Sequence, residues 1–446
     1  MELCDFVSTN RELEQPLVDV VEKCLQANIE TGLPPPIFKT IVCERAEFAF
    51  VILRRLQQSM QGANGQFDRI LELAWKAIYT SATEFRQALT TADVGYYRSL
   101  LRIIYLALHA NASKPNQTTE SAYMVLDILN LVVAKGFKEL ASATHTHPET
   151  ANPEDIALVT AILQASLKLP GISIIHDSLA THIAEDGTIR AATTLYSWSE
   201  RLATENRTTT AAHVTNSNAN DPIYGELSLL FLLELSTIPM LANQLATEGI
   251  LDQILTSSLT THIARQSANP ASSPRLHAIW TRALLPLSLN LLVHIGSRIA
   301  REVHAFLSFF APQLRATITS WKARTVVTLA AVNEAVSIAM VLAVLGRMMG
   351  LASGGACLDG FDKAALVEEV EYLLSHRNYL KSLVAATNKD EEEMLRREEE
   401  ADGNGNGNGN GNGGGGGGSV EGGLVAKVTA GLGVLQGLLA EDEGED

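Results

Sequence analysis

Apolar residues recur at every third or fourth position through most of the chain. This spacing places them on one face of an α-helix, whereas the strict alternation that marks a half-buried strand is hard to find. The pattern therefore predicts an all-α protein. Three stripes show it: Val18, Val21, Cys24, Leu25 and Ile29; Ile70, Leu71, Ala74 and Ile78; Leu100, Leu101, Ile104 and Leu108.

Stretches rich in Pro, Gly, Asn, Ser and Thr separate the apolar stripes. These residues favour turns and end helices. The segments between them predict about fourteen helices, most of ordinary length. The breaks fall at Gly32–Pro36, Gly62–Gly65, Ser113–Gln117, His145–Pro153, Thr208–Pro222 and Ser267–Pro274.

The run ELSLLFLLELSTIPMLANQLATEGILDQIL, residues 226–255, is apolar enough in its first half to suggest a membrane span. A spanning helix needs about 20 apolar residues, but Leu227–Ala242 is shorter and contains Glu234. Thr325–Gly346 is long enough, yet Glu334 lies near its middle, where a carboxylate costs roughly 2.5–3.5 kcal/mol. We therefore predict buried helices and no direct membrane span.

Three segments share a pattern of two apolar residues four apart, followed four residues later by glycine. The glycines are Gly136, Gly187 and Gly249, which are 51 and 62 residues apart (187−136 and 249−187). A helix that ends on a left-handed glycine predicts a helical hairpin. Since one hairpin cannot bury its apolar face alone, we expect the units to stack as a solenoid of irregular armadillo or HEAT-like repeats. A plain helical bundle is the alternative.

The last part of the chain has a different composition. Residues 401–423 read ADGNGNGNGNGNGGGGGGSVEGG, which predicts a flexible linker; the Gly-Lys-Ser/Thr of a phosphate-binding loop is missing. We expect residues 1–400 to form a single elongated solenoid, ending in the solvated acidic run Asp390–Glu400. Residues 424–446 are expected to be a poorly ordered acidic tail, although 424–439 has the pattern of a short amphipathic helix.

The net charge of −16 is unevenly distributed. Residues 389–446 hold 14 acidic and 4 basic side chains, a net −10, which leaves −6 for the rest. A mildly acidic surface lacks the Lys and Arg needed to neutralise phosphates, so we predict no nucleic-acid partner. Four separated cysteines without a C-x2-C pair predict reduced thiols in the core. They are Cys4, Cys24, Cys43 and Cys357.

The search for catalytic or metal-binding residues gives no convincing set. His176, Asp177 and Ser178 are adjacent, so a helix would point them in different directions. The loop containing His145, His147 and Glu149 is expected to be solvated rather than metal-binding. We therefore predict no catalytic residues, no cofactor and no metal, and a protein that is not an enzyme.

Two apolar patches are candidates for partner binding. In HAFLSFFAPQL, three closely spaced rings cannot all face one core; they are Phe306, Phe309 and Phe310. The last long helix carries an apolar stripe that needs covering, because an end helix has no next repeat beside it. Core packing is the alternative for both patches. The candidates on the last helix are Leu366, Val370, Tyr372, Leu373, Tyr379, Leu380 and Leu383, beside Val367 and Leu374.

Three long segments resemble the carboxy-terminal region of the very large scaffold nucleoporins of the nuclear pore's inner ring. They are DPIYGELSLLFLLELSTIPMLANQLATEGILDQIL, RLHAIWTRALLPLSLNLLVHIG and AALVEEVEYLLSHRNYLKSLV. The resemblance covers most of residues 1–400 and implies a right-handed, karyopherin-like superhelix. It also implies a structural role at the nuclear pore complex in the nuclear envelope, and contact with the rest of a parent scaffold chain.

The resemblance further implies partners. In that family, the last helices receive an amphipathic helix from a linker nucleoporin, which places the site near Phe361–Val384 in this sequence. The family's shape also goes with binding of phenylalanine-glycine repeats, and this chain has no Phe-Gly dipeptide to supply such repeats itself.

Two other functions stay open. One is a soluble karyopherin-like transport receptor or adaptor with the same architecture. The other is a helical enzyme with an unrecognised site, for which loss of turnover on changing His176 or His294 would be the evidence.

Overall fold

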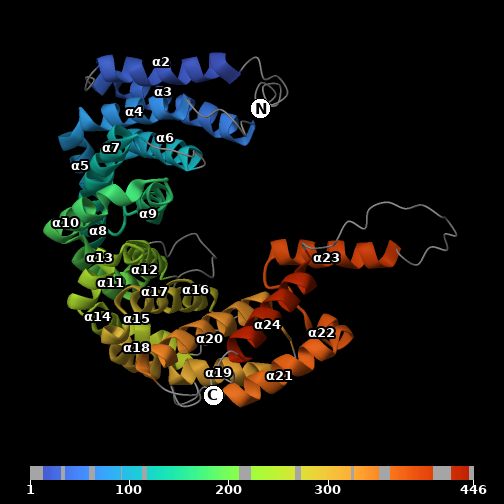
Figure 1. Ribbon diagram of the computed structural model, residues 1–446. Helices are drawn as coiled ribbons and strands as arrows, with labels where there is room; N and C mark the ends of the chain where they lie inside the picture. Colours follow the sequence, from blue (N-terminus) through green and yellow to red (C-terminus); the bar gives the residue numbers. More distant parts are fainter. Residues whose placement is uncertain are drawn as a thin grey trace. The chain divides into compact units, whose positions relative to one another are not determined.

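The computed structural model describes residues 14–31, 36–59, 66–91, 93–112, 118–209, 222–266, 273–322, 326–350, 362–404 and 423–440. Its helices are labelled in Figure 1. The chain divides into two compact units, residues 1–244 and 245–446. The boundary between the units lies within the stretch 226–255. The single elongated solenoid over residues 1–400 stays a prediction.

Unit 1 consists of helices that pack mainly against their neighbours in the sequence. Helix α6 lies against α3, α4 and α9, while α11 lies against α8 and α12. This packing of successive helices is typical of a solenoid. The helices are α2 (Glu14–Thr31), α3 (Pro36–Ser59), α4 (Gln66–Tyr79), α5 (Ala82–Thr91), α6 (Gly95–Asn111), α7 (Thr119–Ile128), η2 (Leu129–Lys135), α8 (Gly136–Thr146), α9 (Pro153–Leu167), η3 (Ile172–Ile175), α10 (His176–Asp186), α11 (Thr188–Thr209) and α12 (Ile223–Ser236); α13 (Pro239–Thr247) contains the boundary.

Unit 2 continues the packing of helices on helices. Its longest described helix, α20, contacts α17, α18 and α24. The helices of unit 2 are α14 (Ile250–Leu255), α15 (Ser258–Gln266), α16 (Pro274–Ala278), η4 (Ile279–Leu284), α17 (Leu285–Ile295), α18 (Ser297–Phe309), α19 (Ala311–Lys322), α20 (Leu329–Met349), α21 (Lys363–Ser375), α22 (Arg377–Leu383), α23 (Lys389–Asn404) and α24 (Leu424–Ala440).

The described residues contain no β-strand beyond one isolated bridge. There the Val327 N–H donates to the Leu383 carbonyl at 2.8 Å, and the Ala385 N–H donates to the Val327 carbonyl at 3.1 Å. This bridge ties the start of α20 to the end of α22. The predicted all-α class is confirmed, and so is the stacking of helices within each unit. The sense of a superhelix stays a prediction.

The predicted breaks agree with the helix ends. Helices α2, α3, α6, α8, α11 and α15 each end at or within a few residues of a predicted break. Pro36, Pro153 and Pro274 each open a helix, where proline fits because its missing N–H has no intrahelical partner. The described residues hold more helices than the sequence predicts, because short turns such as the one at Thr237 divide several apolar runs.

The repeat pattern is right at two glycines and wrong at the third. Gly187 (φ 69°) and Gly249 (φ 67°) take the left-handed conformation and end α10 and α13. Gly136 is helical instead, because the π-helix η2 joins α7 to α8 without a turn. A Cβ on Gly136 would lie 3.3 Å from the Leu131 carbonyl oxygen and 3.5 Å from Leu89 Cδ1. Glycine is therefore favoured there by close packing.

The leucine-rich run that resembles a membrane span forms a buried helix. It forms α12, in which most residues are buried against α9 and α11. Glu234 lies at its edge and accepts a 2.6 Å hydrogen bond from the side-chain amide of Gln164. Burial raises the pKa of Glu234, and the hydrogen bond from Gln164 and the nearby Lys168 oppose this shift.

The expected poorly ordered tail is wrong for residues 424–440. These residues form α24, which packs along α20 and α21 (Figure 1). The physical reason is tertiary, because burial of its leucines stabilises a helix that glycines would weaken in isolation. The acidic run belongs to a separate helix, α23, which extends to Asn404. Of the predicted linker, residues 405–422 lie outside the described residues, as do residues 441–446.

Candidate functional site

An apolar cluster joins the last helices of unit 2. Helices α20, α21 and α24 supply most of its side chains, and all its members are at most 9% exposed. We call it the end cluster. Its members are Val327, Val332, Ala335, Ala339, Leu366, Val370, Leu373, Leu380, Val384, Leu424, Val425, Val428, Leu432, Leu435 and Leu439.

Helix α21 presents the stripe that the sequence predicts. The Asp362 side chain accepts a 3.1 Å hydrogen bond from the Ala365 N–H and so caps its first turn. Spacings of four and three then place Leu366, Val370 and Leu373 on one buried face. The predicted single last helix is broken at His376, and α22 follows with Leu380 fully buried.

Helix α24 covers this stripe from within the same chain. Its buried side chains have helical spacing and face α20 and α21; they are Leu424, Val425, Val428, Leu432, Leu435 and Leu439. We call the opposing residues the α24-binding face. They are Val332, Ala335 and Ala339 of α20 and Leu366, Val370 and Leu373 of α21.

Close approach to α20 accounts for one glycine of α24. A Cβ on Gly431 would lie 2.7 Å from Val332 Cγ1, which is too close for two carbon atoms. Two residues further on, a Cβ on Gly433 would meet nothing within 4 Å. Thus the two helices touch at Gly431, whereas Gly433 faces solvent.

The aromatic residues predicted on the last helix lie at the edge of the end cluster. The Tyr372 ring stacks on His376, with centroids 4.3 Å apart, and meets Tyr379 edge-on at 5.9 Å. Tyr379 is 37% exposed, and Leu383 is half-buried beside the cluster. Phe361 lies outside the described residues.

The phenylalanine patch is mostly core. Phe306 and Phe310 are buried, and the Phe310 ring lies 4.7 Å from that of Trp280. Only Phe309 points outward, with 38% of its surface exposed. The structure therefore separates these three candidates, and one ring remains available at the surface.

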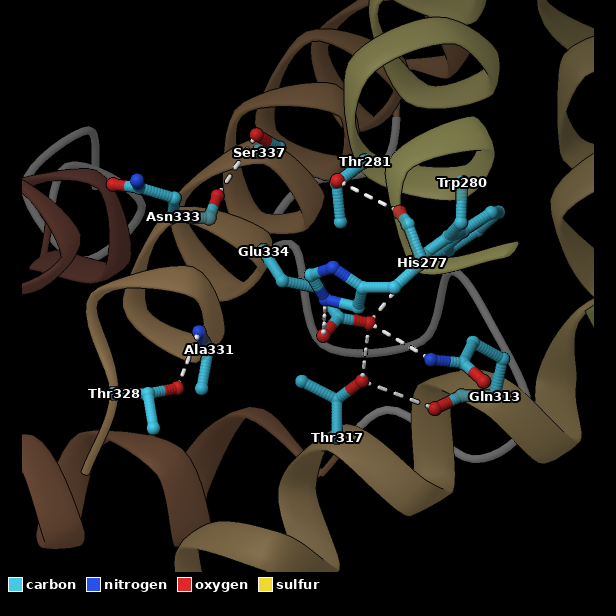
Figure 2. Close-up of polar contacts among 10 residues, drawn as sticks. All are labelled: His277, Trp280, Thr281, Gln313, Thr317, Thr328, Ala331, Asn333, Glu334 and Ser337. Carbon is cyan, nitrogen blue, oxygen red and sulfur yellow. Dashed lines mark hydrogen bonds and ion pairs between the residues drawn. The ribbon is translucent and has the colours of Figure 1, made fainter. Parts of the chain in front are cut away.

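A buried polar network lies on another side of α20. Glu334 Oε1 accepts hydrogen bonds from Trp280 Nε1 (2.9 Å), Gln313 Nε2 (3.0 Å) and Thr317 Oγ1 (2.8 Å), as Figure 2 shows. Its other oxygen lies 3.1 Å from His277 Nε2. Glu334 and His277 are only 4% and 6% exposed. The network joins α16, η4, α19 and α20 within unit 2.

Sequence reasoning missed this network. It used Glu334 only as evidence against a membrane span, although a carboxylate in an apolar helix also indicates buried donors nearby. The partners are 17 to 57 residues away in the sequence, so the pattern alone could not identify them. Because the carboxylate accepts from four side chains in the protein interior, we interpret it as a structural group.

The chemical candidates from the sequence are not brought together. His147 Nδ1 lies 3.7 Å from Glu149 Oε1 at the surface, while the His145 ring packs edge-on against Trp198 at 5.2 Å. Burial lowers the pKa of both His145 and His176. In the part of the chain that the structure describes, no three His, Cys, Asp or Glu side chains form a group that could hold a metal.

The two described cysteines are free, but they are half-buried and not in the core as predicted. Burial is the main cause that raises the pKa of the Cys24 and Cys43 thiols. Cys4 and Cys357 lie outside the described residues.

By length and hydropathy alone, two described helical runs could cross a membrane. They are Pro274–Ile295 and Leu329–Met349, and a bent pair, Pro153–Leu167 with Ile172–Asp186, would be a third. About half of each of the first two runs is buried by the protein itself (50% and 44%). The absence of a direct span stays a prediction.

Comparison with known proteins gives matches to one family. Residues 70–409 match the family model described as the nuclear pore protein NUP188 C-terminal domain. The chain is 32% identical over 406 residues to Nucleoporin NUP188 of Chaetomium thermophilum, covering 83% of this chain and 22% of that protein. It is 26% identical over 428 residues to Nucleoporin NUP188 of Saccharomyces cerevisiae, covering 86% and 25%.

A solved structure is also similar. The fragment Nup188(aa1445-1827) from Myceliophthora thermophila matches with a TM-score of 0.63 and 30% identity, covering 86% of this chain and all of that fragment. This chain thus spans about a quarter or less of the length of the curated relatives. The matches confirm the resemblance found in the sequence and the nuclear pore localisation that it implied.

Proposed function

The chain belongs to the nuclear pore protein NUP188 C-terminal domain family, and we propose from this membership that it is a structural scaffold domain of the nuclear pore complex. We also propose its ligand, an amphipathic helix of a linker nucleoporin bound by the α24-binding face together with α22. One observation carries this second proposal: the α24-binding face already holds a helix through apolar side chains.

The packing of α24 indicates what kind of helix fits. Its buried residues recur at spacings of three and four, from Leu424 to Leu439, which is the pattern of helices that bind in apolar grooves. A small residue is needed where the ligand crosses Val332, as Gly431 shows. A partner helix with leucines at this spacing and one small residue at the crossing would make the same contacts.

The helices around the face carry exposed acidic side chains. On α21, Glu368 and Glu371 lie on the side of the helix away from its buried stripe, and α23 begins with Asp390, Glu391 and Glu392. Their negative charge would favour the approach of a basic helix over an acidic one, and salt would screen this long-range effect. We therefore expect the linker helix to carry Lys or Arg on its polar face.

The rest of a parent scaffold chain is a further proposed partner. Helix α3 of unit 1 exposes three large apolar side chains, Ile41 (46%), Phe48 (54%) and Val51 (42%). Apolar residues that share an exposed region often mark an interaction surface. Because the curated relatives are about four times longer than this chain, other helices of such a parent are suitable occupants.

Family membership favours the scaffold over a soluble transport receptor or a helical enzyme. Binding of phenylalanine-glycine repeats stays a prediction. The phenylalanine patch offers only the outward ring of Phe309, and we assign the repeats no site.

The test is binding of a fluorescent linker-nucleoporin helix to the full chain, measured by anisotropy. Val370→Glu places a carboxylate in the α24-binding face and should weaken binding at least tenfold. Ser375→Glu adds the same charge on the exposed end of α21 and should bind like wild type. Circular dichroism checks that both variants stay helical. If the two variants bind alike, the proposed binding face is wrong.

A further inference from the structure

Helix α24 occupies the face that the proposed function assigns to a partner. We propose that α24 is an intramolecular competitor, which the linker helix must displace before it can bind. This inference rests on the proposed function, because it concerns regulation of the same face. Three features support it: the extent of the family match, the chemistry of the α24 contacts and the sequence of the segment that joins α24 to the domain.

The first feature is that the family match includes the α24-binding face but not α24 itself. The family match runs from residue 70 to 409. It therefore includes α20, α21 and α22, whereas α24 begins at Leu424 and lies beyond it. The binding face is part of the family domain, while the helix on it is outside the matched residues.

The second feature is the nature of the contacts. Among the described residues, α24 makes its polar contacts to other helices with α23 alone. The Val425 N–H donates to Glu398 Oε2 at 3.1 Å, and Lys427 Nζ lies 3.4 Å from Met394 Sδ. Toward α20 and α21 the contacts are apolar. When α24 leaves, no buried donor or acceptor on the face loses a partner in α24, and another apolar helix can take its place.

The third feature is the connection. Residues 405–422 join α23 to α24 and read GNGNGNGNGGGGGGSVEG, so Val420 is their only large apolar residue. A segment of this length can span roughly 60 Å when extended, at about 3.3–3.6 Å per residue. A helix joined by such a chain has an effective concentration on the order of 1 mM at its face. If isolated α24 binds with a dissociation constant of about 0.1 mM, it weakens a competing helix about tenfold.

The experiment compares full chains that differ in how well α24 binds. Leu435 is fully buried in the end cluster, and Leu435→Glu should release α24. Gln436 is exposed on the same turn, so Gln436→Glu is the matched control. The fluorescent linker helix should bind Leu435→Glu about tenfold more tightly than wild type or Gln436→Glu. A synthetic peptide of residues 423–440 should also bind Leu435→Glu and compete with the linker helix.

Hydrogen exchange on the intact chains gives a second, independent readout. In wild type, adding the linker helix should speed exchange of the α24 amides and leave α20 and α21 protected. In Leu435→Glu, α24 alone should lose protection. If α20 and α21 lose protection with it, α24 is a core helix of unit 2 and the proposal is overturned.

The remaining outcomes separate the two proposals. Equal, measurable affinity for wild type and Leu435→Glu overturns the competitor while the proposed ligand stands. If neither chain binds the linker helix, the proposed ligand fails, and the competitor for it fails as well. If light scattering shows that wild type is a dimer and Leu435→Glu a monomer, α24 binds a second copy, which also overturns competition within one chain.

Discussion

The two sides of helix α20 are held by different chemistry. Toward α16, η4 and α19, Glu334 accepts hydrogen bonds from side chains at fixed positions on three other elements (Figure 2). Toward α21 and α24, Val332, Ala335 and Ala339 contribute only apolar surface. Both sides are buried to a similar degree, so burial alone does not distinguish them.

The difference concerns which neighbours can be exchanged. A buried carboxylate needs its donors at set distances and angles, so only one arrangement of those helices satisfies it. An apolar face requires only an apolar partner of matching shape, which many amphipathic helices can provide. We infer that the polar side fixes the position of α20 in unit 2, while the apolar side can change its occupant.

The largest expected effect is on the polar side. Glu334→Ala removes the buried acceptor that His277, Trp280 and Gln313 share, whereas the Thr317 hydroxyl keeps the Gln313 carbonyl as an acceptor at 3.1 Å. The change should lower the free energy of unfolding of this region by about 3–5 kcal/mol. The measurement is hydrogen exchange of the α20 amides, which should become much faster.

The neighbouring residue provides the control for that change. Asn333 is exposed and points away from the network in Figure 2, so Asn333→Ala should alter the stability by no more than about 0.5 kcal/mol. If Glu334→Ala costs as little as Asn333→Ala, the network does not fix α20, and the contrast between its two sides disappears.

A smaller effect is expected on the apolar side. Gly431→Ala forces a methyl group against Val332, and such overpacking costs about 1–3 kcal/mol, partly offset by the higher helix propensity of Ala, about 1 kcal/mol. The binding of α24 should weaken, and its amides should exchange faster while those of α20 stay protected. Gly433→Ala gains the helix propensity of alanine without any contact with Val332, so it should slow hydrogen exchange of the α24 amides instead. If both variants change the exchange rate of the α24 amides in the same direction, the close approach at Gly431 is contradicted.

Local chemistry made the helix boundaries predictable. Proline at Pro36, Pro153 and Pro274 and left-handed glycine at Gly187 and Gly249 act within one turn of the residue itself, so the sequence shows their effect directly. Gly136 has the same local pattern but a different role, because a π-helix carries the chain through it. The closeness of Leu89, on another helix, is not visible in the pattern around Gly136.

Only one half of the candidate site, the apolar stripe of α21, could be predicted, because only that half follows from local sequence. Helical spacing identified Leu366, Val370 and Leu373 as one stripe, since that follows from periodicity. It did not reveal that α24 covers them, because α24 gains its order from burial against α20 and α21 rather than from its own glycine-containing sequence. Contacts between distant segments determine both the occupant of the face and the partners of Glu334.

The smallest expected effect compares a buried histidine with a half-buried one. His277 has Glu334 as a partner, whereas His145 in unit 1 has no hydrogen-bond partner at Nε2 among the described residues, and burial lowers its pKa. The unfolded chain, with an ordinary His pKa of about 6.5, therefore binds more protons than the folded chain below that pH. The contribution of His145 to the stability of unit 1 should be complete above pH 6.5 and should fall as the pH drops through the lowered pKa, by at most about 1.4 kcal/mol per pH unit.

Hydrogen exchange of α8 at pH 7 and pH 5.5, corrected for intrinsic rates, measures this loss. His145→Phe keeps a ring against Trp198 and should reduce the pH dependence. An unchanged pH dependence in His145→Phe would assign the loss to other groups, such as His176, whose pKa burial also lowers.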